Sequence, residues 1–157
     1  MKKSDQVEIV PYDPAYREDF KRLNIEWLEA YFRVEEADEK ILSDPEKYIL
    51  APGGVIFFAR RGGEIVGTCA LTPRGNGAVA LSRMGVTQSH RGKGIGRKLL
   101  AEAIRWYEKS GAAFLCLESN TLLEAAIGLY ESVGFAHAEH PEPPTHERSN
   151  VYMIYGE

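Results

Sequence analysis

Arg91-Gly92-Lys93-Gly94-Ile95-Gly96-Arg97-Lys98 is the stretch that decides how this chain folds. It lies between an apolar, strand-like run at 79–86 and an amphipathic run at 99–109 with helical spacing. Glycine permits positive φ angles and leaves no Cβ to block a ligand that approaches the main chain. The first turn of a helix adds unpaired N–H donors and the positive end of the helix dipole. The stretch therefore predicts a strand-to-helix turn that binds a phosphate or pyrophosphate.

Two other phosphate-binding motifs do not fit this turn. A P-loop requires Gly-x-x-x-x-Gly-Lys-Ser/Thr, but Gly96 is followed by Arg97-Lys98-Leu99, which offers magnesium no hydroxyl. A dinucleotide motif requires Gly-x-Gly-x-x-Gly early in a β-α-β unit, and residues 92–96 have another spacing. The remaining alternative is a flexible surface turn with solvated charges. Four cations at one strand-to-helix junction favour the anion site over that alternative.

Length and composition limit the classes of protein that this chain can be. Its 157 residues fit one domain, spanning 1–157, which buries about 70% of the unfolded surface without metals or disulfides. Cys69 and Cys116 lie in apolar runs, which predicts buried thiols and no metal site. No apolar run approaches the ~18 residues of a membrane span, and no apolar leader follows Met1. We expect a soluble, cytoplasmic protein that binds no membrane.

The charge distribution points to a small anionic ligand. A net charge of −4 argues against general nucleic-acid binding, which requires a basic surface. The cations are nevertheless concentrated at 90–98, while 35–39 are acidic. A basic patch that binds nucleic acid stays as an alternative. In that case the affinity for nucleic acid would fall steeply with salt, and the small anionic ligand would not compete with nucleic acid for the patch.

Hydrophobic periodicity predicts an α+β fold with a mixed, mainly antiparallel central sheet flanked by helices. Strands are expected at 7–10, 55–59, 65–71, 78–86, 114–117, 135–138 and 151–155, and helices at 14–32, 39–42, 95–109 and 122–132. Gly85, inside the fourth strand, predicts a β-bulge or a close backbone approach that would admit a ligand.

Two segments resemble the GCN5-related N-acetyltransferase (GNAT) superfamily. Arg91, Gly94 and Gly96 match its acetyl-CoA motif, Arg/Gln-x-x-Gly-x-Gly/Ala, and 84–86 precede them as in the family. The run 125–135, Ala-Ala-Ile-Gly-Leu-Tyr-Glu-Ser-Val-Gly-Phe, resembles the family's late helix. The two motifs stand in the family's order and at the family's separation, and the expected order of strands and helices agrees with the family over nearly the whole chain. The resemblance implies the acyl-CoA N-acyltransferase fold and direct transfer of acetyl from acetyl-CoA to a primary amine of a small molecule or peptide, in a ternary complex.

The resemblance also implies which residues contact acetyl-CoA. The glycine-rich turn would hold the pyrophosphate, the bulged strand would pair with pantetheine, and a strand N–H would polarise the thioester carbonyl. The expected contacts are Met84, Gly85, Val86, Arg91, Gly92, Lys93, Gly94, Ile95, Gly96, Arg97 and Asn120. Asn120 departs from the family spacing, because it precedes Tyr130 by ten residues; Ser119 or Thr121 are alternative helix caps.

Two residues are candidates for proton transfer. Tyr130 matches the family tyrosine that protonates the departing thiolate; the alternative is a core tyrosine. Family members often carry a glutamate on the strand before the turn, but residues 79–83 contain no carboxylate. Glu118 is therefore the candidate base, directly or through water, with a structural pairing to Arg83 as the alternative. An amine that arrives neutral would need no base.

Acceptor specificity is expected near the first helices and the last strand. Candidate substrate-binding residues are Tyr31, Phe32, Arg148 and Asn150, with Glu35, Glu36, His146, Glu147 and Ser149 nearby. An acidic wall would suit a cationic amine, whereas Arg148 would suit a carboxylate. The alternative to an enzyme is a non-catalytic acyl-CoA-binding module. The resemblance also suggests a possible homodimer; the acceptor itself is not identified.

Overall fold

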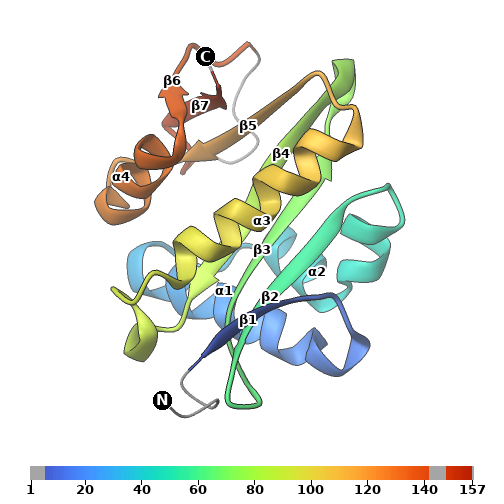
Figure 1. The fold of residues 1–157 in the computed structure, drawn as a ribbon, viewed down its shortest axis with the longest axis vertical. Helices are drawn as coiled ribbons and strands as arrows, with labels where there is room; N and C mark the ends of the chain where they lie inside the picture. The colour runs from blue at the N-terminus through green and yellow to red at the C-terminus, as the bar shows by residue number, and fades with distance from the viewer. Residues whose placement is uncertain (1–5, 142–147, 157) are drawn as a thin grey trace.

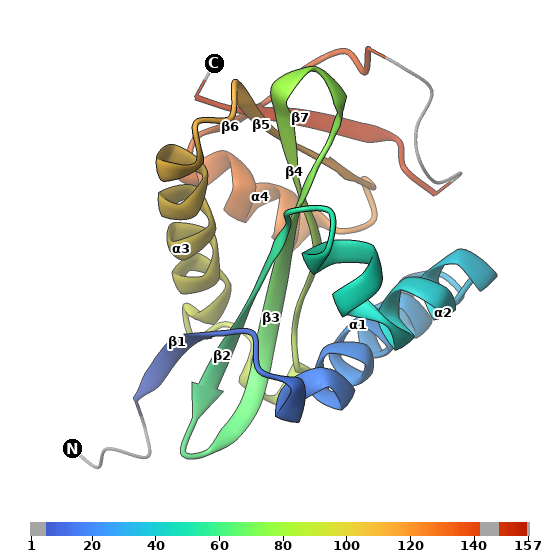
Figure 2. The same cartoon turned by 90° about the vertical axis from the view of Figure 1, so that its right-hand side faces the viewer.

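The computed structural model describes residues 6–141 and 148–156, so the predicted acceptor residues His146 and Glu147 lie outside the described part. A seven-stranded sheet, in the order β1-β2-β3-β4-β5-β7-β6, carries helices on both faces (Figures 1 and 2). Only β4 and β5 pair in parallel among its neighbours, which confirms the predicted mixed, mainly antiparallel α+β sheet. The strands are β1 (Val7–Pro11), β2 (Val55–Arg61), β3 (Glu64–Pro73), β4 (Ala78–Val86), β5 (Phe114–Ser119), β6 (Phe135–His137) and β7 (Val151–Tyr155).

In the described part of the chain, four α-helices cover the sheet: α1 (Arg17–Tyr31), α2 (Glu36–Ser43), α3 (Ile95–Ser110) and α4 (Glu124–Val133). Asp13 caps a 3₁₀ turn at Pro14–Tyr16, so α1 begins three residues later than Pro14 predicted. A capping box between Glu35 and Asp38 starts α2 earlier than expected. A π-helical turn, Glu46–Leu50, was not predicted. Within the described ranges, no helix is both long enough and apolar enough to cross a bilayer.

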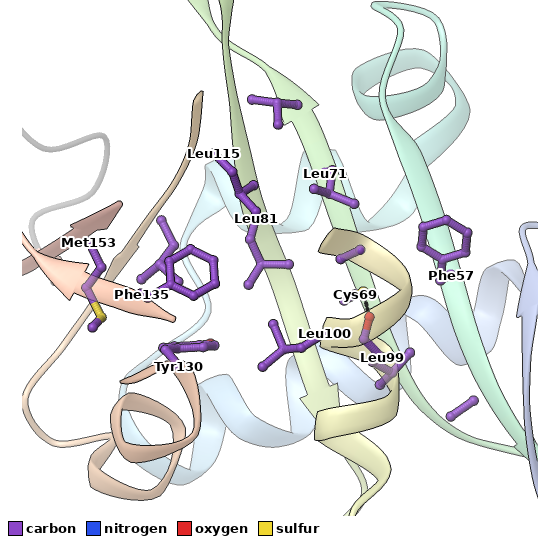
Figure 3. Close-up of a cluster of buried hydrophobic side chains, with 14 of the residues drawn as sticks. Phe57, Cys69, Leu71, Leu81, Leu99, Leu100, Leu115, Tyr130, Phe135 and Met153 are labelled. Atoms are coloured by element: carbon purple, nitrogen blue, oxygen red, sulfur yellow. Dashed lines mark hydrogen bonds between the residues drawn. The ribbon is translucent and has the colours of Figure 1, made fainter. Parts of the chain in front are cut away.

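Each face of the sheet has its own apolar core. Figure 2 shows α3 and α4 on one face and α1 and α2 on the other. Neighbouring residues of β2 alternate between these cores: Phe57 packs toward α3, and Phe58 packs with Phe20 of α1. Burial on both faces explains the continuous apolar runs. The α3-side core includes Cys69, whose thiol pKa is raised by desolvation to about 12 (Figure 3).

Strands β4 and β5 separate halfway along β4. They pair over Ala78–Leu81, whereas β4 continues to Val86. On its other edge, β4 bulges: residues 82 and 85 pair with β3 residues 70 and 68, so two β4 residues face one. Arg83 lies in this bulge with φ 53°. The predicted bulge is present, but at residues 83–84; the close backbone approach at Gly85 is to α1.

Candidate active site

A cavity of about 900 Å³ opens where β4 and β5 separate. One end is lined by the second half of β4, the glycine-rich turn and α4, and we call this the donor end. The other end, the acceptor end, is lined by residues of α1, α2, β5, β7 and the segment before β7. The cavity is continuous between the two ends. It brings together residues from 27 to 152 in the sequence.

The glycine-rich turn presents backbone to the donor end. Gly92 and Gly94 have φ angles of 77° and 81°, in the left-handed region that favours glycine. Gly94 is the N-cap of α3 and supplies no side-chain cap, so the first N–H groups of the helix face outward from this turn. A Cβ at either glycine would have no atom within 4 Å. Both glycines line the cavity, so the backbone of this turn borders it.

Two other residues of the motif serve packing. Ile95 is buried against the core. A Cβ at Gly96 would lie 3.0 Å from Cδ2 of Leu129 and 3.2 Å from Cε of Met84. Glycine at 96 thus lets α3 approach α4 and β4 closely. Lys93 is not among the cavity-lining residues in the described part.

The arginines of the turn have partners within the protein. Arg91 donates from Nε to the carbonyl oxygen of Val86 at 3.0 Å, and its Nη2 lies 3.8 Å from a carboxylate oxygen of Glu26 in α1. Arg97 donates from Nη2 to the hydroxyl of Ser132 in α4 at 3.0 Å. These contacts join the turn to both helical layers, so the arginines shape the turn as well as adding positive charge.

Tyr130 lines the cavity from α4, with a side chain that is largely buried. Its ring packs edge-on against Phe135, with 5.9 Å between ring centroids (Figure 3). Burial, together with nearby Cys69, raises the pKa of Tyr130 to about 12. The hydroxyl therefore stays protonated at neutral pH. Tyr130 belongs to the core and also lines the cavity.

Glu118 lies just beyond the last β4–β5 pair, at Leu117, and lines the acceptor end. Its Oε2 is 2.5 Å from Nε2 of His140, a residue that sequence reasoning missed. The His140 ring stacks on Tyr152 of β7 at 4.5 Å between centroids. The alternative partner considered for Glu118, Arg83, instead forms an ion pair with Asp38.

Asp38 is the second residue that sequence reasoning missed, because it lies in an acidic stretch that resembles a solvated face. Its side chain is 0% exposed. It accepts hydrogen bonds from Arg83 Nη1 at 2.7 Å, from Arg148 at 2.6 and 3.1 Å, and from the Glu35 N–H at 2.9 Å. Burial alone would raise its pKa, but these hydrogen bonds outweigh burial and hold the pKa of Asp38 well below its usual range.

The remaining predicted acceptor residues are divided by the structure. Tyr31 and Phe32 line the cavity, as does Arg148, whose guanidinium already binds Asp38. Asn150 accepts a hydrogen bond from the Thr121 N–H at 3.0 Å and is outside the lining of the described part. Asn120 lines the cavity, and its Nδ2 donates to the Arg148 carbonyl at 2.5 Å. Both asparagines thus hold the segment before β7 against the start of α4.

Comparison with known proteins identifies acetyltransferases. Residues 16–135 match the family described as Acetyltransferase (GNAT) family. An uncharacterised N-acetyltransferase of Schizosaccharomyces pombe is 30% identical over 131 residues, which cover 80% of each chain. N-acetyltransferase family 8 member 2 of Rattus norvegicus is 28% identical over 119 residues, 73% of this chain and 53% of that protein. The chain spans about half the length of the first curated relatives that it matches.

Solved structures share the fold. A GNAT-family acetyltransferase of Staphylococcus aureus Mu50 superposes with a TM-score of 0.87 at 23% identity, covering 96% of this chain and 98% of that one. YncA of Salmonella typhimurium, solved with its cofactor acetyl-CoA, has a TM-score of 0.73 at 18% identity and covers 94% and 91%. At these identities the likeness establishes the acyltransferase fold alone.

Proposed function

Since this chain belongs to the acetyltransferase (GNAT) family, we propose that it transfers an acetyl group from acetyl-CoA to a primary amine of a small molecule or peptide. Transfer would occur directly, in a ternary complex. One observation carries the proposal: a single cavity joins the open glycine-rich turn to Tyr130 and Glu118, at the point where β4 and β5 separate. Donor and acceptor can therefore meet in one space.

The donor end fits acetyl-CoA. The N–H groups around Gly92, Gly94 and the start of α3 would hold the pyrophosphate, since both glycines line the cavity and Gly94 is the N-cap of α3. The edge of β4 that β5 leaves unpaired would hydrogen-bond the pantetheine amides like an added strand. Met84 and Val86 line this path. Acetyl-CoA supplies the activated acyl group.

The chemistry follows from the groups around the separation of β4 and β5. The acceptor nitrogen attacks the thioester carbonyl carbon, a C–N bond forms and the C–S bond breaks. A backbone N–H in or just after the bulge, at 84–86, would stabilise the oxyanion. Glu118, paired with His140, would accept the ammonium proton directly or through water. Tyr130, protonated because its pKa is about 12, would donate a proton to the thiolate.

A non-catalytic acyl-CoA-binding module is the second candidate. It is favoured by one observation: residues 79–83, on the strand before the glycine-rich turn, carry no carboxylate. The donor end would be the same in both cases. The two candidates differ only in whether an amine is turned over.

Measurement of free CoA release separates these candidates. The whole chain is incubated with acetyl-CoA and a panel of amines, amino acids and peptides, and the released thiol is detected. Amine-dependent release above the rate with acetyl-CoA alone is the result expected for the enzyme. Binding of acetyl-CoA without turnover of any panel member would favour the module, and absence of binding would contradict both.

A further inference from the structure

Asp38 joins three segments that are far apart in the sequence. From α2 it reaches Arg83 in the β4 bulge, 45 residues away, and Arg148 before β7, 110 residues away. The side chains of Arg83 and Arg148 are 8% and 13% exposed. One carboxylate thus pairs with two nearly buried cations, and the Oε2 of Glu35 adds a second negative charge at 3.5 Å from Arg148.

The hydrogen bonds of Asp38 restrict where its two arginine partners can lie. A buried charge is costly unless it is paired and fully hydrogen-bonded, and removing one partner leaves the others uncompensated. Asp38 is satisfied on both oxygens, so the positions of the two guanidinium groups are closely defined. The surface ion pair between Lys21 and Glu39, on the next residue of α2, has no such constraint because Glu39 is 53% exposed.

The backbone at Arg83 is unusual in the same place. Its φ of 53° is left-handed, which a residue with a Cβ adopts only where its surroundings impose it. Among described non-glycine residues, only Asn76, in a turn, shares a positive φ. Asp38 holds the side chain of Arg83, so the ion pair and the left-handed backbone conformation occur at the same residue.

We propose that Asp38 is a positioning residue of acetyl transfer: it holds Arg83 in the left-handed conformation that aims the bulge N–H groups at the acetyl carbonyl. The same carboxylate holds Arg148 at the acceptor end, so donor carbonyl and acceptor wall are set by one group. This inference rests on the proposed function, in which the bulge contacts the carbonyl. It adds a residue that does not itself touch the reacting atoms.

The experiment measures the infrared carbonyl band of acetyl-CoA labelled with ¹³C at the carbonyl carbon, bound to the whole chain. A hydrogen bond to the carbonyl moves this band to lower frequency than that of the same thioester in a solvent that donates no hydrogen bond, which is the reference for the shift. We expect the shift in wild type, and its loss in Asp38→Asn with unchanged affinity for CoA, which has no acetyl group. Glu39→Gln, a neighbouring carboxylate, is the control and keeps the shift. In amine turnover, kcat of Asp38→Asn falls about 10-fold or more.

A second pair of variants keeps the inference testable if Asp38→Asn does not fold. Arg83→Ala and Arg83→Gly both remove the ion pair, but only glycine adopts a positive φ without strain. We expect Arg83→Ala to lose the band shift and Arg83→Gly to keep most of it. Equal bands in wild type, Asp38→Asn and Arg83→Ala would overturn this inference alone. A wild type that binds no acetyl-CoA, or shows no shift, would overturn the bulge contact and with it both proposals.

Discussion

Gly85 of β4 lies so close to Trp27 of α1 that a Cβ at position 85 would be 2.9 Å from the Cδ1 atom of the indole. The same Cβ would lie 3.2 Å from the carbonyl oxygen of Leu23, which as backbone cannot swing away. Trp27 in turn lines the cavity. The glycine therefore sets how closely α1 approaches the strand that bears the bulge.

Gly85→Ala is expected to destabilise the fold by about 1–3 kcal/mol through overpacking. The free energy of unfolding in urea measures this. Gly128→Ala is the matched control, because Gly128 lies in α4 with nothing within 4 Å of the added Cβ. That control should stabilise the protein by up to about 1 kcal/mol. Equal effects of the two substitutions would contradict the close approach.

Gly94→Ala is expected to weaken acetyl-CoA binding about 10-fold, which corresponds to about 1.4 kcal/mol, since the strained Cβ would disturb the turn whose N–H groups are proposed to hold the pyrophosphate. Calorimetric titration measures the affinity. Gly111→Ala is the control at the other end of α3: both glycines have a φ of 81° and open space, so the strain is equal. Only Gly94→Ala should change the affinity for acetyl-CoA. A loss of affinity in Gly111→Ala as well would mean that both substitutions act through the stability of α3.

Tyr130→Phe is expected to lower kcat about 100-fold with little change in acetyl-CoA affinity, because the thiolate loses its proton donor. Tyr155→Phe is the control, since the Tyr155 ring also packs on Phe135, at 5.5 Å. With a pKa of about 12, Tyr130 should remain an active acid up to pH ~10. An unaltered kcat would refute the assignment and leave Tyr130 as a core residue.

Glu118→Gln is expected to lower kcat/KM for the amine at least about 100-fold at neutral pH. The loss should shrink as pH rises, because an amine that arrives neutral needs no base before it attacks, and water or hydroxide can take the proton that its nitrogen loses as the amide forms. Glu131→Gln is the control: Glu131 also pairs with a histidine, His137 at 3.0 Å, but on the surface. A pH-independent loss would show that Glu118 positions the acceptor without accepting its proton.

Asp38→Asn is expected to lower the free energy of unfolding by about 3–5 kcal/mol near neutral pH, because it removes the charge that pairs with Arg83 and leaves Arg148 with the weaker contact to Glu35. The folded pKa of Asp38 is depressed, so its stabilisation is complete above about pH 4 and is lost as pH falls through the folded value. The difference in free energy of unfolding between wild type and Asp38→Asn should therefore be constant from pH 7 to about 5 and become smaller below about pH 4. Urea titrations at several pH values check this, with Asp19→Asn, a surface pair with Arg22, as the control.

Local patterns in the sequence predicted the sheet, the order of the elements and the glycine-rich turn, whereas the expected role of Tyr130 rested on the family resemblance. These features depend on neighbours in the chain: alternation in a strand, spacing on a helix, glycine at a helix start. Helix boundaries were less well predicted, because the capping box that starts α2 uses Glu35 at the cap, where Ser, Thr, Asp or Asn is usual.

Long-range pairs could not be predicted. Asp38 appeared to be part of a solvated acidic run, and only folding brings Arg83 and Arg148 to it. His140 meets Glu118 across 22 residues, from a connection without periodic pattern. The expectation that Arg148 binds an acceptor carboxylate assumed an unoccupied guanidinium, whereas the structure places Asp38 against it.

The early separation of β4 from β5 leaves the sheet unfinished. Beyond Leu81, β4 no longer pairs with β5, so we expect the backbone amides on that side of β4 to exchange with solvent in the absence of ligand. A ligand that pairs with this edge would complete the sheet as an eighth, non-covalent strand. Binding of this ligand would then stabilise the folded protein by an amount that increases with the ligand's affinity. Slowed hydrogen exchange of the backbone amides at 82–86 would therefore report binding of the donor even when the acceptor is not known.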